Sequence, residues 1–132
     1  MAKKKKQRQN VSTGSPYEES IGFSRAVRAG DRVLVSGTAP VWPDGSVNLE
    51  PKVQAHRCLE IILAALAEAG AEPRHVVRTR AYLTDPADAE VVGAAHAEVF
   101  GETRPASTMV VVSALLDRRW KVEIEAEAVI DD

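Results

Sequence analysis

Two neighbouring segments decide the fold: Arg104-Pro105-Ala106-Ser107-Thr108-Met109-Val110-Val111-Val112, and Lys121-Val122-Glu123-Ile124-Glu125-Ala126, which follows it closely. Both are rich in β-branched residues, so we expect strands over residues 106–113 and 120–130. Side chains along a strand alternate between its two faces. The run of three valines therefore places apolar side chains on both faces of its strand, and both faces need cover.

The segments before this pair predict two more strands and one helix. Residues 21–28 and 32–36 form a hairpin around Ala29-Gly30-Asp31, and Gly37 ends its second strand. A helix starts at Pro51 and stops at Gly70. Its apolar positions recur every three or four residues and form a core stripe: Ala55, Cys58, Ile62, Leu66 and Ala69.

Residues 75–83 then predict a further strand, and Asp85-Pro86 begins a second helix that ends at Gly101. Its inward positions are Val92, Ala95 and Val99. The resulting order β-β-α-β-α-β-β is typical of an α+β domain with both helices on one face of a sheet. Because two helices cannot cover both faces, we expect an apolar open face that a partner subunit covers.

The composition indicates one globular domain without a charge-driven partner. The chain has 132 residues, 45% of them hydrophobic, and a formal net charge of -2, which leaves no general attraction to nucleic acid or membrane. The exception is residues 2–8, with five cations but no aromatic or apolar side chains for stacking or for an amphipathic face. We expect a disordered basic tail over 1–16 and the domain over 17–132, with RNA or lipid headgroup contact as the alternative for the tail. No apolar run approaches the ~18 residues of a membrane span.

The single cysteine, Cys58, excludes an internal disulfide and fits a reducing cytoplasm. His56 lies two residues before it, but positions i and i+2 point about 200° apart on a helix and cannot share a ligand. His75 and His96 add no metal-ligand spacing. We therefore expect a buried thiol, no metal, no cofactor and a cytoplasmic protein.

Three motifs resemble the RidA (YjgF) family: Val35-Ser36-Gly37-Thr38-Ala39-Pro40, the helix pattern over 92–100, and the C-terminal pair of segments quoted above. The similarity runs from about residue 16 to residue 129. It implies a chorismate-mutase-like fold, a homotrimer with three small-molecule clefts between subunits, and the hydrolysis of reactive enamines and imines.

The same resemblance implies a candidate site in which some positions match the family pattern and others do not. Ser36 and Gly37 match the residues whose backbone lines the cleft, and Glu123 matches the glutamate that orients or activates water. Other site positions differ from the family pattern: Ser107 replaces the carboxylate-binding arginine, Met109 a frequent cysteine, Val111 a frequent glutamate, Ser24 the aromatic residue of the first strand, and Gly93 the asparagine of the second helix. A serine hydroxyl lacks the paired donors of a guanidinium, so we expect a less charged pocket.

Glu123, Glu125 and Glu127 alternate with apolar residues and so share one side of their strand, about 7 Å apart. A solvated row at a sheet edge is one interpretation. The family match favours the other, in which Glu123 acts as a general base with a pKa raised by burial. His96 is a second titratable candidate, with a purely structural hydrogen bond as its alternative.

Two functions remain open at this point. One is an enzyme that hydrolyses an enamine, imine or related C–N bond on a non-amino-acid substrate. The other is a trimer that binds a metabolite without turnover. Chemistry on RNA is a weaker third hypothesis, supported here only by the lysine-rich tail, and fold alone does not decide between them.

Overall fold

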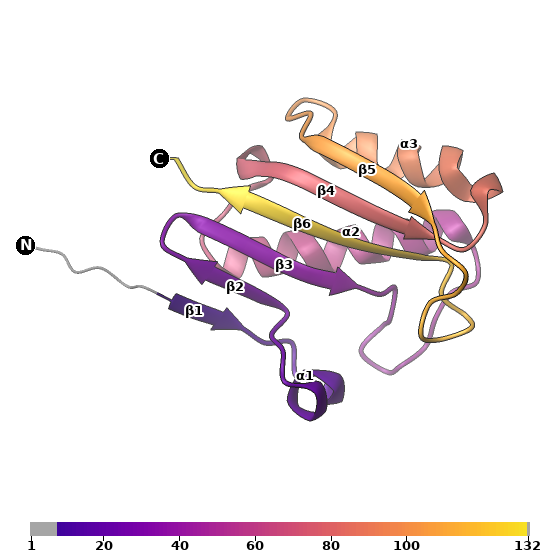
Figure 1. Cartoon of the computed structure of the whole chain (residues 1–132), viewed down its shortest axis with the longest axis horizontal. Coiled ribbons are helices and arrows are strands. Elements are labelled where there is room, and N and C mark those ends of the chain that lie inside the picture. The colour runs from indigo at the N-terminus through magenta and orange to yellow at the C-terminus, as the bar shows by residue number, and fades with distance from the viewer. Residues whose placement is uncertain (1–7, 132) are drawn as a thin grey trace, which may run out of the picture.

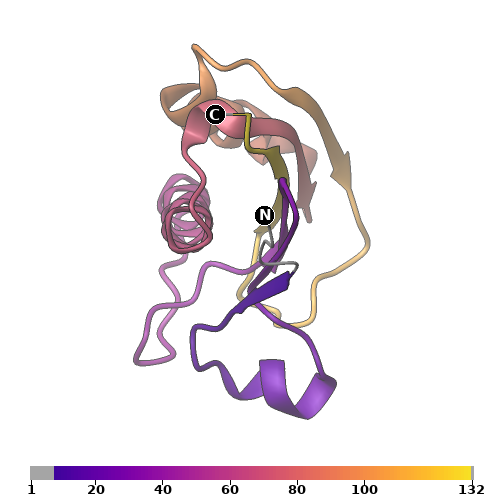
Figure 2. The ribbon, with the colours of Figure 1, turned by 90° about the vertical axis from the view of Figure 1, so that its left-hand side faces the viewer.

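Alternating apolar residues build one mixed sheet, and two helices pack against one of its faces (Figures 1 and 2). The computed structural model describes residues 8–131. Its strands are β1 (Arg8–Val11), β2 (Ala26–Ala29), β3 (Arg32–Thr38), β4 (Val76–Leu83), β5 (Ala106–Val111) and β6 (Val122–Val129). Its helices are α1 (Pro16–Ile21), α2 (Pro51–Glu68) and α3 (Ala89–Phe100), with short 3-10 turns η1 (Pro73–His75) and η2 (Pro86–Asp88). The predicted α+β class and the order of its main elements are confirmed.

The last strand in sequence, β6, lies in the middle of the sheet. The strand order is β1-β2-β3-β6-β4-β5, and β6 pairs antiparallel with both β3 and β4. Only β4 and β5 run parallel, with α3 in the connection between them. Since β6 is central, the interpretation of its glutamates as a solvated sheet-edge row is wrong.

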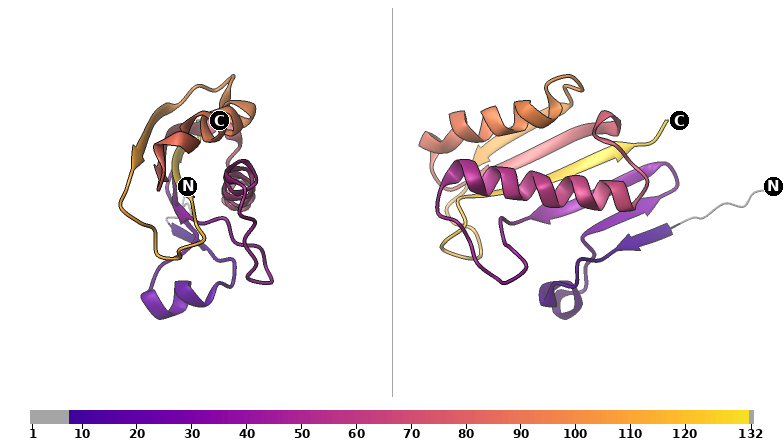
Figure 3. Two further views of the ribbon diagram at one scale, coloured as in Figure 1. Left: turned by 90° about the vertical axis from the view of Figure 1, so that its right-hand side faces the viewer. Right: turned by 180° about the vertical axis from the view of Figure 1, so that it is seen from behind.

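Helices α2 and α3 cover one face of the sheet (Figure 3), and the buried apolar side chains of β3, β4 and β6 lie on that face. All five predicted core residues of α2 are buried, as are Val92 and Ala95 of α3. The Cys58 thiol is fully buried and donates to the carbonyl of Val122 at 3.8 Å, and burial raises the pKa of this thiol. Among residues 8–131, no helix has both the length and the apolar character needed to span a membrane.

The opposite, open face of the sheet is largely ionic, which corrects the expectation of an apolar face. Glu125 accepts from Arg80 at 2.7 Å and from Tyr82 at 3.0 Å. Exposed apolar side chains gather instead on the edge strand β5, whose residues are all exposed. Val110 and Val111, for example, are 41% and 51% exposed. The surface that needs a cover is therefore β5.

The segment before β2 differs most from the prediction. Strand β1 lies within the predicted disordered tail. It is ordered because it pairs with β2, which buries Val11 opposite Ala26. Helix α1 follows, with Ser15 as its N-cap and a left-handed Gly22 (φ 91°) at its end, so the first hairpin strand begins at Ala26 rather than at Ile21. Residues 1–7, which hold four of the five cations of the predicted basic tail, lie outside the described residues.

A buried carboxylate holds this N-terminal segment in place. Glu18 is 7% exposed and accepts hydrogen bonds from Ser12 Oγ at 2.8 Å and Thr13 Oγ1 at 2.6 Å. Burial acts to raise the pKa of Glu18, but the hydrogen bonds from Thr13 and Ser12 outweigh it, and the pKa falls below the usual 4.5. The ionised form is therefore the one that the fold stabilises.

We expect Glu18→Gln to lower the free energy of unfolding by about 1 to 3 kcal/mol at neutral pH, since the substitution removes the charged carboxylate that accepts the buried hydrogen bonds of Ser12 and Thr13. The folded-state pKa of Glu18 is depressed, so its contribution is complete above pH 4.5 and disappears as the pH falls through the lower folded value. Urea unfolding of both proteins at several pH values measures how the contribution of Glu18 to the free energy of unfolding depends on pH. The exposed Glu19→Gln is the matched control, and a difference between Glu18→Gln and wild type that does not narrow below pH 4.5 would contradict the assignment.

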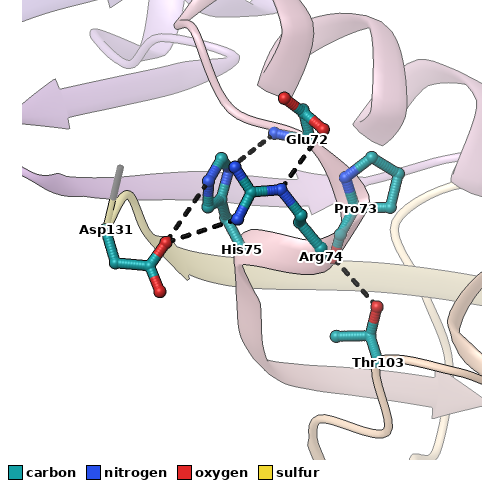
Figure 4. Close-up of polar contacts among 6 residues, drawn as sticks. All are labelled: Glu72, Pro73, Arg74, His75, Thr103 and Asp131. Carbon is teal, nitrogen blue, oxygen red and sulfur yellow. Dashed lines mark hydrogen bonds and ion pairs between the residues drawn. The ribbon is translucent and has the colours of Figure 1, made fainter.

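A polar cluster ties the end of β6 to the start of β4 (Figure 4). The backbone N–H of Glu72 donates to Nδ1 of the buried His75 at 2.9 Å, and Asp131 Oδ1 lies 3.6 Å from His75 Nε2. The guanidinium of Arg74 lies between the carboxylates of Glu72 and Asp131, at 3.4 Å from the first and 3.5 Å from the second. These contacts give His75 a structural role.

Candidate functional site

Glu123 lies on the open face of β6, against a bulge in β3. Regular pairing between β3 and β6 is interrupted between Val35 and Thr38, so Ser36 and Gly37 occupy the irregular stretch. A Cβ atom added to Gly37 would stand 2.5 Å from Glu123 Oε2. Because glycine has no Cβ atom, the Glu123 carboxylate can lie directly against the backbone at this position.

The surroundings of Glu123 raise the pKa of its carboxyl group. Burial raises the pKa of Glu123, the positive charge of Arg25 partly opposes this, and the neighbouring Glu125 adds to it, with a net value above the usual 4.5. A carboxylate with a raised pKa is a better acceptor for a proton from water. The pKa of Glu123 is thus shifted in the direction that a general base needs, and its catalytic role stays a prediction.

Arg25 is a candidate site residue that the sequence analysis missed. Its guanidinium donates to the carbonyl oxygen of Gly37 at 2.9 Å and lies 5.4 Å from the ring centre of Phe23. Its Nε is buried without a hydrogen-bond partner in the part of the chain that the structure describes. The alternation of Phe23 and Arg25 just before β2 was the available signal, but the residue gains meaning only through the pairing that brings it to Gly37 and Glu123.

The predicted residues Ser24 and Ser36 line an open groove of about 510 Å³ beside α1 and β2. Ser36 Oγ donates to the carbonyl of Ser24 at 2.7 Å, and Ser24 Oγ accepts from Asn10 at 2.8 Å. The other residues around the groove are Arg8, Asn10, Glu18, Glu19, Gly22, Phe23 and Val27. Its mixed polar and apolar lining suits a small molecule rather than a large apolar one.

A second group of predicted residues lies on the helix-covered side of the sheet. Ser107 pairs in register with the buried Thr79, and Thr79 Oγ1 donates to Ser107 Oγ at 2.9 Å. Nε2 of His96, from α3, lies 2.8 Å from the same Thr79 oxygen. Met109 shares the face of Ser107, as expected from the alternation of a strand, and a Cβ at Gly93 would meet nothing within 4 Å.

The predicted site is therefore split between the two faces of the sheet. On β4, Tyr82 lies opposite Glu123 on the open face, whereas Thr79 lies beside Ser107 on the helix side. A single chain thus keeps Ser107 and Glu123 apart. A site that contains both residues needs two chains.

The histidines and the cysteine form no metal site in residues 8–131, where no three potential ligands lie close enough together. His56 pairs with Glu98 across the two helices at 3.0 Å, while Cys58 points into the core. The predicted divergence of His56 and Cys58 is confirmed.

Comparisons with known proteins agree on one family. The sequence model described as Endoribonuclease L-PSP matches residues 15–130. The uncharacterized protein SCO2049 of Streptomyces coelicolor is 42% identical over 123 residues, which cover 89% of each chain. A RutC family protein of Pyrococcus abyssi is 37% identical over 108 residues, 80% of this chain and 84% of its own.

The similarity extends to solved structures. Rv2704 of Mycobacterium tuberculosis, described as a member of the YjgF/YER057c/UK114 family, is 42% identical and superposes with a TM-score of 0.87 over 94% of this chain and 100% of its own. Fold, motifs and sequence identity thus point the same way. The chain belongs to the YjgF family, also called RidA or RutC, as its motifs predicted.

Proposed function

We propose that this protein is a homotrimer that binds a small molecule in clefts between subunits and hydrolyses an enamine, an imine or a related C–N bond there. The observation that carries the proposal is the half-buried Glu123 carboxylate, seated against Gly37 with a raised pKa. The substrate lacks an α-carboxylate, because Ser107 provides no cation to bind one. In this arrangement the β5 face of one subunit supplies Ser107 and the open face of its neighbour supplies Glu123.

In the proposed reaction, Glu123 accepts a proton from water as the water oxygen attacks the imine carbon. The C–O bond forms, the π electrons of the C=N bond move to nitrogen, and nitrogen takes up a proton from solvent water. When the resulting carbinolamine collapses, its hydroxyl proton passes to solvent water, the C–N bond breaks, and the proton held by Glu123 passes to the leaving amine. The products are a carbonyl compound and an amine or ammonia, and Glu123 is ionised again.

The pH dependence of turnover tests the role of Glu123. The acid limb of kcat/KM should report its carboxyl group, and Arg25→Gln should move that limb to higher pH because Arg25 lowers the pKa of Glu123. Ammonia release from neutral imines, followed across pH, measures both curves. Arg25→Lys keeps the positive charge and should leave the limb near its wild-type position. A limb that moves to lower pH in Arg25→Gln would contradict the proposal.

A metabolite-binding trimer without turnover is the second candidate. The position occupied by Ser107 favours it, since the chain lacks there the cation on which the family's hydrolysis of amino-acid imines depends. Calorimetric binding of a compound that wild-type protein leaves unchanged during long incubation would favour this second function.

Light scattering at micromolar concentration should give the mass of three chains, because the exposed β5 requires a partner. Val110→Lys places a charge on this strand and should yield monomers. Val91→Lys on α3 is the matched control, as Val91 and Val110 are equally exposed at 41%. Removing residues 1–7 should leave the trimer intact, and the truncation has to stop there because β1 pairs with β2. A monomeric wild-type protein would refute the trimer.

A further inference from the structure

Three neutral side chains from three different elements form a continuous hydrogen-bonded chain. Thr79 of β4 is 2% exposed, and its hydroxyl lies 2.9 Å from Ser107 Oγ of β5 and 2.8 Å from His96 Nε2 of α3. A threonine hydroxyl has one proton, so Thr79 can donate to only one of these neighbours and accepts from the other. The chain therefore has a direction, which the two ends set together.

His96 sets the direction at the inner end. Its ring packs against Phe100, with the ring centres 4.9 Å apart, and burial lowers the pKa of His96 below 6.5, which keeps the imidazole neutral near pH 7. The single Thr79 proton is donated to Ser107 Oγ, so Nε2 of His96 carries a proton and donates to Thr79, and the Ser107 proton is left free to point outward. If the proton of His96 were on Nδ1, Thr79 would donate to His96 and Ser107 would donate to Thr79. Ser107 could then only accept a hydrogen bond from a ligand.

The outer end of the chain is accessible. Ser107 is exposed. Met109, the next residue on the same face of β5, is apolar and 36% exposed. A ligand can therefore reach the Ser107 hydroxyl, and its neighbour on this face of the strand is uncharged.

We propose that Ser107, Thr79 and His96 form a neutral hydrogen-bond relay that presents the Ser107 hydroxyl to an uncharged acceptor on the ligand, such as an amide or ketone oxygen. The inference rests on the proposed function and adds the class of group that the cleft accepts. A single neutral donor suits such an oxygen. A carboxylate would be left with much of its charge unpaired, which makes its transfer from water unfavourable.

Titrations of the full chain with propionamide and propionate, followed by NMR chemical shifts, test this selectivity. Wild-type protein should bind the amide more tightly than the acid. Thr79→Val keeps the shape of the side chain but removes the link, and should weaken amide binding by about threefold to tenfold. Thr79→Ser restores a hydroxyl and should recover most of it, while propionate binding should stay the same in all three proteins.

The imidazole ¹⁵N signals of His96 in the free protein provide a readout that needs no ligand. They should change between wild type and Thr79→Val, while those of His56 and His75 stay in place, and unchanged His96 signals would overturn the relay. Amide binding that Thr79→Val does not weaken would overturn its role in selectivity and leave the cleft itself intact. Failure of both probes to bind wild-type protein would overturn the role of the relay in ligand selection, whereas the proposed hydrolysis would be judged separately by the turnover of Glu123→Gln.

Discussion

Glu123→Gln should lower the turnover of a hydrolysed imine by about 10² to 10⁴ while the fold, the trimer and ligand affinity persist. Glutamine has nearly the same size and fits the space beside Gly37, but it cannot accept a proton from water. The loss should therefore fall on kcat. Steady-state kinetics together with calorimetric binding separates this effect from a loss of affinity.

Glu125→Gln is the matched control for this prediction. Glu125 lies two positions along on the same face of β6 and loses the same charge, but its carboxylate is held by Arg80 and Tyr82. Glutamine keeps one acceptor oxygen for Arg80, and its amide N–H can donate to the hydroxyl oxygen of Tyr82, so turnover should remain within a small factor of wild type. If Glu123→Gln and Glu125→Gln lose equal amounts of turnover, Glu123 has no special role. In a pure binding protein there would be no turnover to lose, and only affinity would respond.

If the motif match places Ser107 at the position of the family's carboxylate-binding arginine, hydrolysis of 2-aminoacrylate or of imines of ordinary amino acids should be weak. The loss of a charge-assisted contact of this kind costs about 2 to 5 kcal/mol, a factor of roughly 30 to several thousand in kcat/KM. Ser107→Arg should restore a large part of that factor. Ser107 is exposed, so the larger side chain does not have to enter the core. Coupled assays of ammonia release measure both proteins.

Thr108→Arg provides the control for the charge itself. Thr108 is the next residue on β5 and lies beside Arg80, on the open face of the sheet, so it adds the same cation on the other side of the strand. Only Ser107→Arg should gain activity on carboxylate substrates. Equal gains in both variants, or a wild-type rate that matches an arginine-bearing relative, would show that position 107 does not control substrate choice.

Local periodicity predicted most of the fold. The apolar stripe of α2 and the alternation of β6 are visible without knowledge of any partner, because spacing along one helix or strand determines which side chains share a face. Strand β1 and helix α1 were missed for the opposite reason. Val11 is buried only because β1 pairs with β2. The segment after it carries local helix signals at Ser15 and Gly22, but it is short and also depends on the hydrogen bonds of the Glu18 carboxylate.

The candidate site was predictable only where it depends on one strand. Alternation places Glu123 and Glu125 together, and the structure agrees. The approach of Arg25 to Gly37 and the chain through Thr79 depend on the register between strands far apart in sequence, which no local pattern contains. The central place of β6 has the same origin, and it is what removes Glu123 from the sheet edge.

The position of β6 has a consequence for biosynthesis. Strands β3 and β4 are not paired with each other, and each obtains its shared neighbour only from residues 122–129. While these residues are still inside the ribosome, the emerging chain exposes an unpaired edge on each of these two strands, and the helices lack the buried side chains of β6. Pairs such as Arg32 with Val129 also close very long loops, which slows folding. The central part of the sheet therefore forms only after residues 122–129 have emerged, and until then the open edges of β3 and β4 are free to pair with another copy.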